Sequence, residues 1–213
     1  LSAFALLEEA PSAVLARIRL ARDPGDAVAG AVHVQESVAE TVEVKRAVFA
    51  ELDCLAAPDA LLASSSSAIV AFRFTQGLEG RGRCLIAHPA APPFLVPIVE
   101  IVPAPWTDPG AVESARALME RAGQTPIVVK REIEGFVFNR LQGALLREAY
   151  CLIRDGYATA EDIDRAVVAG PGRRWAITGP FENADLNYRG GVREHATRMG
   201  PAYARMGAER GQD

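Results

Sequence analysis

The sequence has few cysteines, few aromatic residues, few lysines and no long apolar run. Its 213 residues include three cysteines, and aromatic residues make up 7%. Cys54, Cys84 and Cys151 are far apart and odd in number, which argues against a disulfide framework and a cysteine-based zinc site and favours a reducing, cytoplasmic location. No run of about 18 apolar residues occurs, so we expect no membrane span. A secretion signal has a basic segment followed by an apolar one, and the residues near position 1 do not show this pattern.

The charge balance excludes two further classes of partner. The chain has 23 Lys and Arg residues against 27 Asp and Glu residues, a net charge of −4. Nucleic acids and anionic membranes attract basic surfaces, so we expect neither as the main partner. Lys45 and Lys130 are the only lysines, which we attribute to genomic composition bias rather than to chemistry.

The apolar residues, 49% of the chain, are enough for one large domain or two modest ones. In the first part of the chain, short apolar runs alternate with amphipathic segments. We expect strands at residues 13–20, 31–35, 60–63, 83–87, 97–103 and 125–130. We expect helices at residues 2–9, 24–30, 43–55 and 108–122. This alternation indicates βαβ units and predicts an α/β fold with a mostly parallel sheet.

After Gly135 the pattern is that of helices alone. A long helix is expected at residues 136–155, a capping residue at Thr159, chain breaks at Gly170 and Gly179, and a helical tail after residue 190. No strand is expected beyond residue 131. The sequence therefore predicts an α/β domain over residues 1–131 and an all-α domain over residues 132–213.

Two polar residues in apolar strands are candidates for chemistry. His88 follows the expected strand at 83–87, and ligands of open parallel sheets bind beyond the carboxyl ends of strands. It is a candidate acid or base, or a histidine that only caps the strand. Glu100 stands inside the apolar run at 98–102, where an unpaired carboxylate is costly to bury. We predict that Glu100 contacts His88; the alternative is an exposed position on an edge strand.

Other polar residues are also candidates for binding or catalysis. The four serines at 64–67 follow another expected strand, so their hydroxyls either bind a substrate or phosphate oxygen or cap the next helix. Asn139 stands in an apolar stretch and needs hydrogen-bond partners, from the protein or from a substrate. We interpret His33 as a core residue and His195 as a solvated one.

Several common motifs are absent. The 213 residues contain no G-x-G-x-x-G sequence and no P-loop. No histidine or acidic cluster has the spacing of metal ligands, so we expect no metal site.

Four blocks resemble a known family. In order, they are LLASSSSAI, IAHPAAPPFLVPIVEIVP, EIEGFVFNRLQGALLREA and WAITGPFE. From about residue 32 to residue 187 the sequence is similar to the 3-hydroxyacyl-CoA dehydrogenase superfamily. It resembles most closely the lambda-crystallin, or L-gulonate 3-dehydrogenase, type, chiefly through HP-x-x-PP and PIVEIVP. This resemblance implies a Rossmann-type NAD-binding domain followed by a helical domain that also dimerises.

The resemblance also implies roles for individual residues. It places the catalytic histidine at His88 and its carboxylate partner at Glu100. It places the active-site serine, which also contacts the cofactor, at Ser67 and the asparagine of the helical domain at Asn139. Two further contacts to the cofactor, NAD, are implied at Glu40 and Lys45.

The implied activity is oxidation of a 3-hydroxyl group, in an acyl-CoA ester or in a free hydroxy acid such as L-gulonate. Arg173 and Arg174 would suit a free carboxylate, or are simply surface arginines. The alternative is a non-enzymatic, crystallin-like dimer that keeps the fold without binding the cofactor. Its only support is a departure from the family, the absence of the glycine-rich turn and the first βαβ unit. A second departure is Ala91, where family members often carry a cofactor-contacting Asn.

Two expectations concern the whole protein. We expect roughly 50 to 80 further N-terminal residues with a G-x-G-x-x-G turn, and weak NAD binding by the 213 residues alone, because the pyrophosphate lacks a helix N-terminus. The strand at 13–20 would then occupy an exposed place in the sheet. The helix at 136–155 is apolar on more than one face, which predicts a homodimer through the helical half.

Overall fold

A computed structural model describes residue 7 and residues 9–210. The helix expected at residues 2–9 lies outside this described part. The chain divides into two compact units, Leu1–Arg140 and Leu141–Asp213. We describe each unit by itself.

The first unit is built on a sheet of five strands in the order β1-β2-β3-β4-β5. The strands are β1 (His33–Glu36), β2 (Leu61–Ser64), β3 (Cys84–Pro89), β4 (Ile98–Pro103) and β5 (Thr125–Val128). β1, β2 and β3 are parallel, β4 runs antiparallel to β3, and β5 is parallel to β4. Five of the six expected strands are present, so the predicted α/β fold with a mostly parallel sheet is confirmed.

The prediction of a strand at residues 13–20 is wrong. This segment begins in the short helix α1 (Pro11–Leu15) and continues without a strand to α2 (Pro24–Val28). Pro11 lies in the first turn of α1, a position for which the fixed φ of proline is suited. The alternation here rests partly on alanine, which has little preference for strands. The next turn is as expected: the Asp23 side chain accepts from the Asp26 N–H and caps α2.

The expected alternation of strands and helices also fails once. Residues 90–97, between β3 and β4, form no helix, and the chain reverses its direction there. A parallel connection needs a crossover of a dozen or more residues, whereas an antiparallel one does not. This reversal brings the ends of β3 and β4 that carry His88 and Glu100 into one register.

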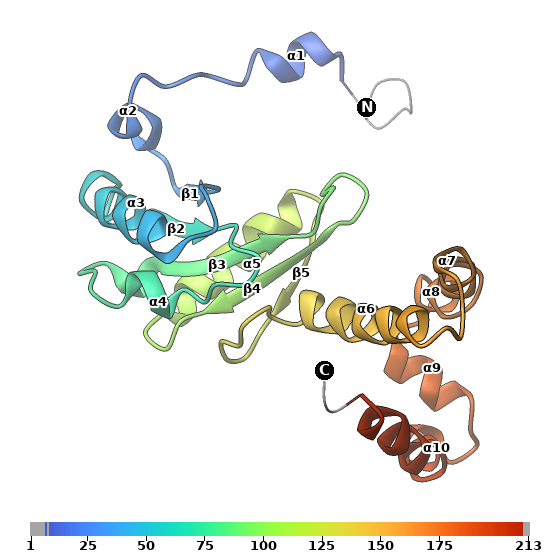
Figure 1. Ribbon diagram of the computed structural model, residues 1–213. Coiled ribbons are helices and arrows are strands. Elements are labelled where there is room, and N and C mark those ends of the chain that lie inside the picture. The colour runs from blue at the N-terminus through green and yellow to red at the C-terminus, as the bar shows by residue number, and fades with distance from the viewer. Residues whose placement is uncertain (1–6, 8, 211–213) are drawn as a thin grey trace. The chain divides into compact units, whose positions relative to one another are not determined.

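Helices cover both faces of the sheet (Figure 1). On one face α3 (Val42–Leu55) and α4 (Phe72–Thr75) bury a core that includes Phe49, Leu62 and Phe74. On the other face α5 (Pro109–Arg121) packs on a smaller core that includes Leu85 and Ile101. A single 3-10 turn, η2 (Arg81–Arg83), leads into β3. Because alternate residues of the central strands β2, β3 and β4 face opposite cores, these three strands are largely apolar along both faces.

The second unit is helical. The helix α6 (Phe138–Arg154) begins in the first unit and continues into the second, followed by α7 (Ala160–Ala169), α8 (Pro171–Trp175), α9 (Pro180–Leu186) and α10 (Gly191–Ala208). The Thr159 hydroxyl accepts from the Asp162 N–H at 3.1 Å and caps α7, as its sequence predicts. From residue 132 to residue 210 every regular element is a helix. Among the described helices, none is both long and apolar enough to cross a bilayer.

Candidate active site

The predicted contact between His88 and Glu100 is present. The antiparallel register of β3 and β4 places the two residues directly opposite each other, and His88 Nδ1 lies 2.9 Å from Glu100 Oε2. The two side chains are 7% and 1% exposed. The pairing therefore explains how a carboxylate is tolerated inside an apolar strand.

Glu100 is held from a second side by the start of α6. Its Oε1 atom accepts hydrogen bonds from the backbone N–H groups of Val137 and Phe138, both at 2.8 Å. Burial raises the pKa of the Glu100 carboxyl, but hydrogen bonds from His88, Phe138 and Val137 outweigh burial and hold that pKa below its usual value. Glu100 is thus a carboxylate with both oxygens engaged.

This arrangement fixes the role of each imidazole nitrogen. An ionised carboxylate only accepts hydrogen bonds, so the Nδ1 atom of His88 is the donor to Glu100. In the neutral ring Nε2 is then the acceptor, and no described residue is bonded to it. A base with its free lone pair on Nε2 and a carboxylate behind Nδ1 is arranged to take a proton and to carry the resulting charge.

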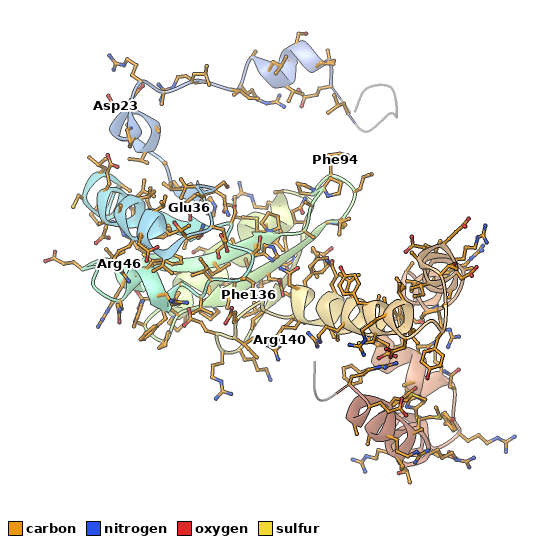
Figure 2. The ribbon with its side chains drawn as sticks, viewed as in Figure 1. Asp23, Glu36, Arg46, Phe94, Phe136 and Arg140 are labelled. Carbon is orange, nitrogen blue, oxygen red and sulfur yellow. The ribbon has the colours of Figure 1, made fainter. Side chains whose placement is uncertain are left out.

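A left-handed turn connects β5 to α6 beside this pair. Gly135 and Phe136 have φ values of +73° and +48°, and the positive φ of Phe136 is uncommon for a residue with a large side chain. Phe136 is fully buried, and its ring lies 5.7 Å from the His88 ring, centroid to centroid. Figure 2 shows Phe136 where the segment after β5 leads into α6. The turn directs the next two N–H groups at Glu100.

The four serines at 64–67, the first of which ends β2, differ in their hydrogen-bond partners. Ser64 donates to Glu36 and Ser66 donates to Glu40, each at 2.5 Å, so both hydroxyls are used inside the protein. The Ser65 hydroxyl is bonded to Gln35. Ser67 is exposed, and no described residue is bonded to its hydroxyl. Of the four, the structure leaves Ser67 available to a ligand.

Asn139 is close to the serines but contacts backbone. Its side-chain amide donates to the Ser67 carbonyl oxygen at 2.8 Å. A second link joins the same segments, because the Gly135 N–H donates to the Ala68 carbonyl oxygen at 3.3 Å. The start of α6 is therefore tied both to Glu100 and to the loop that carries Ser67.

Glu40 and Lys45 lie behind the same loop. Glu40 Oε1 accepts from the N–H groups of Ser67 and Ala68 at 3.0 and 3.2 Å, and the Glu40 side chain is 41% exposed. Lys45 is 1% exposed, and its ammonium lies within 3.4 Å of oxygens of Glu36, Glu40 and Ser64. The structure thus leaves part of Glu40 open to a ligand and directs Lys45 to protein oxygens.

Sequence reasoning missed Glu36 and Phe136. Glu36 ends β1 and is a buried carboxylate; the available signal was an acidic residue directly after an apolar strand. Phe136 follows a glycine in an apolar stretch, and no pattern in the sequence indicates a positive φ at that position. Neither Arg173 nor Arg174 is buried; Arg174 is hydrogen bonded to Asn183.

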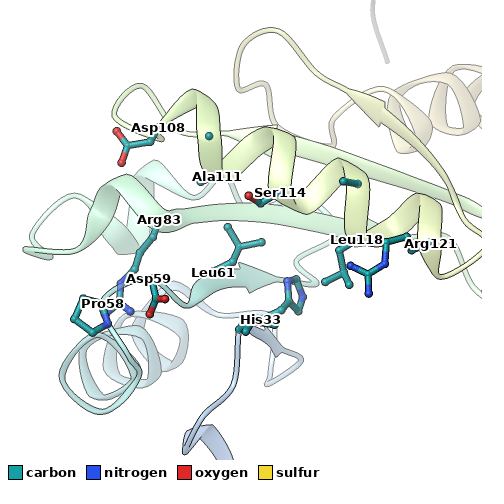
Figure 3. Close-up of a pocket in the computed structure, with 13 residues that line it drawn as sticks. His33, Pro58, Asp59, Leu61, Arg83, Asp108, Ala111, Ser114, Leu118 and Arg121 are labelled. Atoms are coloured by element: carbon teal, nitrogen blue, oxygen red, sulfur yellow. The ribbon is translucent and has the colours of Figure 1, made fainter.

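A separate groove lies away from these residues. It has a volume of about 650 Å³ between the amino ends of β1 and β2 and the helix α5, and it is lined by residues that include His33, Leu61 and Leu118 (Figure 3). His33 is therefore at a groove rather than in the core as expected. The groove contains none of the predicted site residues. Within the described residues, no group of three or more His, Cys, Asp or Glu side chains is placed to hold a metal ion.

Comparison with known proteins identifies the family. The model of the 3-hydroxyacyl-CoA dehydrogenase NAD-binding domain matches residues 2–133, and that of the 3-hydroxyacyl-CoA dehydrogenase C-terminal domain matches residues 135–210. The chain belongs to the 3-hydroxyacyl-CoA dehydrogenase family. The resemblance stated from the sequence is confirmed, as is the order of a Rossmann-type domain and a helical one. The cofactor expected from the sequence, NAD, is the one for which the first family model is named.

Individual relatives support the same family. The chain is 45% identical over 168 residues to the lambda-crystallin homolog of Bos taurus, covering 79% of this chain and 52% of the relative. It is 36% identical to L-carnitine dehydrogenase of Pseudomonas putida, covering 91% and 60%. Among solved structures, an NAD⁺-dependent dismutase, 5-formyl-3-hydroxy-2-methylpyridine 4-carboxylic acid 5-dehydrogenase, matches with a TM-score of 0.80 at 34% identity, covering 85% and 58%. The chain spans about half the length of the lambda-crystallin relatives it matches.

Proposed function

We propose that the protein is an NAD-dependent oxidoreductase that oxidises the 3-hydroxyl group of a hydroxy acid or an acyl-CoA ester to a ketone. The observation that carries this proposal is the state of His88. Its Nδ1 atom is bonded to the Glu100 carboxylate, and Nε2 has no partner among the described residues. This ring stands at the carboxyl end of β3, which is parallel to β2, the edge at which open α/β sheets bind ligands.

In the proposed reaction His88 takes the proton of the substrate hydroxyl on Nε2. Glu100 stabilises the imidazolium that forms, and the two N–H groups of α6 keep the carboxylate in place. The Ser67 hydroxyl donates to the substrate oxygen, and Asn139 positions Ser67 through its carbonyl. Ser67 and Glu40 would hold the nicotinamide end of NAD⁺, which would supply the hydride acceptor for the substrate carbon. A positioned base of this kind contributes about 10²–10⁴ to the rate.

The residues present fit the reacting end of NAD. Ser67 offers a free hydroxyl, and the partly exposed carboxylate of Glu40 is an acceptor for a ribose hydroxyl. Both belong to the loops that follow β2 and β1. The pyrophosphate end is different, because these 213 residues include no glycine-rich turn. We therefore assign to this chain the nicotinamide end of the cofactor site.

Two kinds of relative support the proposed substrate classes. One solved structure that the chain resembles is called a 3-hydroxyacyl-CoA dehydrogenase, from Archaeoglobus fulgidus, and one relative is named for a free acid, L-carnitine. We propose a free hydroxy acid or an acyl-CoA ester on this basis. The direct test is NAD⁺ reduction with L-gulonate, L-carnitine and a 3-hydroxybutyryl thioester. Turnover of at least one supports the proposal, and no turnover of any 3-hydroxy compound contradicts it.

The alternative function is a crystallin-like protein without cofactor binding, a possibility that the similarity to lambda-crystallin homologs raises. A calorimetric titration of the product of the whole gene with NADH separates the two. We expect saturable binding by that protein and weak binding by residues 1–213 alone, because the pyrophosphate would lack a helix N-terminus. No binding by the whole gene product would favour the alternative. Tight binding by residues 1–213 alone would show that the cofactor site is misplaced.

We also propose how the chain divides into domains and how it assembles with a second copy. We assign residues 1–131 to cofactor binding and residues 132–213 to substrate binding and dimerisation, with a cytoplasmic location. Large apolar side chains on α6 that are at least 39% exposed, namely Leu141, Leu145, Tyr150 and Ile153, support the homodimer.

A further inference from the structure

Lys45 is buried at a place where the proposed reaction gives it no role. It lies on the first turns of α3, 1% exposed, and its ammonium is 3.1 Å from Glu36 Oε2 and 3.2 Å from Glu40 Oε2. Two further oxygens, Glu36 Oε1 and the Ser64 hydroxyl, lie at 3.2 and 3.4 Å. An ammonium group has three hydrogens, and three protein groups surround this one. Lys45 thus has its donors directed inward rather than to a ligand.

The two carboxylates that Lys45 joins differ in their surroundings. Glu36 is 1% exposed and also accepts from the Val38 N–H and the Ser64 hydroxyl. Glu40 is 41% exposed and follows β1 in a loop. Lys45 lies between them and ties the partly exposed Glu40 to the buried Glu36. Lys45 is therefore the fixed group against which Glu40 is held.

Glu40 in turn organises the loop after β2. Its Oε1 atom accepts from the Ser66 hydroxyl and from the N–H groups of Ser67, Ala68 and Ile69, the last at 3.4 Å. Three successive N–H groups directed at one oxygen form a concave anion site. Here a protein carboxylate fills it. In this conformation the Ser67 carbonyl oxygen meets Asn139, and the Ser67 hydroxyl is left without a partner.

We infer that Lys45 is a positioning residue: by holding Glu40 against the N–H groups of Ser67, Ala68 and Ile69, it fixes the loop that presents the Ser67 hydroxyl. This inference rests on the proposed function in one respect, namely that the Ser67 hydroxyl binds a ligand. It assigns Lys45 an indirect role in place of a direct contact to the cofactor. The competing explanation is that Lys45 merely neutralises Glu36.

The Lys45→Met variant alone does not separate these explanations, because it leaves Glu36 buried and unpaired, which is strongly destabilising. The decisive comparison is Glu36→Gln with the double variant Glu36→Gln/Lys45→Met. In the single variant Lys45 still holds Glu40. In the double variant no buried carboxylate lacks its partner, and only the link to Glu40 is lost. Glu43→Gln is the matched control, since Glu43 is an exposed carboxylate in the first turn of α3.

Amide hydrogen exchange of the ligand-free chain gives the first readout. In the double variant we expect the amides of Ser67, Ala68 and Ile69 to exchange at least about tenfold faster than in Glu36→Gln, while core amides such as that of Leu62 keep their protection. Equal exchange of the loop amides in the two variants would overturn the inference. Equally faster exchange of loop and core amides would also overturn it, since that is general destabilisation.

The pH profile of the same amides gives the second readout. Burial raises the pKa of the Glu40 carboxyl, but the Ser66 hydroxyl, Lys45 and the Ala68 N–H outweigh burial and lower it. We expect the amide proton shifts of Ser67–Ile69 to follow that titration, and its midpoint to rise in the double variant. An unchanged midpoint would overturn the inference. The proposed function fails on a different result, the absence of NADH binding by the unmodified whole gene product.

Discussion

At the scale of single residues, the bond between His88 and Glu100 decides which imidazole nitrogen is free. In Glu100→Gln the new amide must serve both His88 and the N–H groups of Val137 and Phe138. Its oxygen cannot accept from both sides, so either the α6 contact is lost or Nδ1 of His88 becomes an acceptor and Nε2 a donor. We expect kcat to fall by about 10² or more. Turnover within twofold of the unmodified enzyme would show that Glu100 does not set the tautomer.

The lowered pKa of Glu100 also predicts how stability depends on pH. A carboxyl whose pKa is lower in the folded state contributes stability that is present above the unfolded value, near 4.5, and is lost as the pH falls through the folded value. Thermal unfolding from pH 7 to pH 3 should therefore show the difference between the unmodified chain and Glu100→Gln shrinking below about pH 4.5. A difference that is constant over this range would contradict the pairing.

For Glu132 we expect stability to depend on pH in the opposite direction from Glu100. Burial raises the pKa of its carboxyl, and hydrogen bonds from the N–H groups of Phe72 and Ala71 lower it less. A raised pKa means that stability is lost as the pH rises through the folded value. Glu132→Gln keeps an acceptor for the Phe72 N–H and removes the charge, so we expect Tm to rise by about 1–2 °C at pH 7 and to change less at pH 4. Glu134→Gln, at an exposed position, should leave Tm unchanged; a lower Tm for Glu132→Gln at pH 7 would contradict this reasoning.

At the scale of elements, the left-handed backbone conformation of Phe136, in the turn from β5 into α6, can be tested by mutation. Phe136 has a φ of +48° and is fully buried. Phe136→Ala and Phe136→Gly both remove the ring, at a cost of about 3–5 kcal/mol. Glycine alone takes a positive φ without strain, so the glycine variant should be the more stable of the two by about 1 kcal/mol. Urea unfolding of both variants measures the order, and a more stable alanine variant would rule out the left-handed turn.

Elements that local sequence determines were predictable, whereas contacts between distant parts of the chain were harder to predict. The five strands that were predicted correctly are short runs with apolar residues, and the central three, β2, β3 and β4, are buried along most of their length. Residues 13–20 also contain several apolar side chains, but in the described part of the chain they pair with no strand, and Pro11 starts a helix just before them. The contact between His88 and Glu100 was predictable from the cost of an unpaired carboxylate. Its geometry was not, because it depends on the chain reversing between β3 and β4. The bond from Phe138 to Glu100 joins residues 38 apart, and no local pattern records it.

At the scale of the whole molecule, we expect a homodimer formed through the helical half. Leu141 and Tyr150 on α6 are 63% and 64% exposed, and exposed apolar patches mark interaction surfaces. Light scattering should give twice the chain mass at micromolar concentration, and Leu141→Glu should shift it toward the monomer. Leu20→Glu, at a residue that is 92% exposed in the first unit, is the control. A monomeric unmodified protein would refute the dimer.

The central claim is that His88 is the base of a dehydrogenase. The most direct test is kcat of His88→Gln in the whole gene product, with a substrate that the unmodified enzyme oxidises and with His33→Gln as the matched control at the separate groove. We expect kcat to fall by at least about 10² in His88→Gln with the thermal unfolding curve preserved, and His33→Gln to keep normal turnover. A His88→Gln enzyme that retains more than about half of the normal kcat would remove His88 from the mechanism.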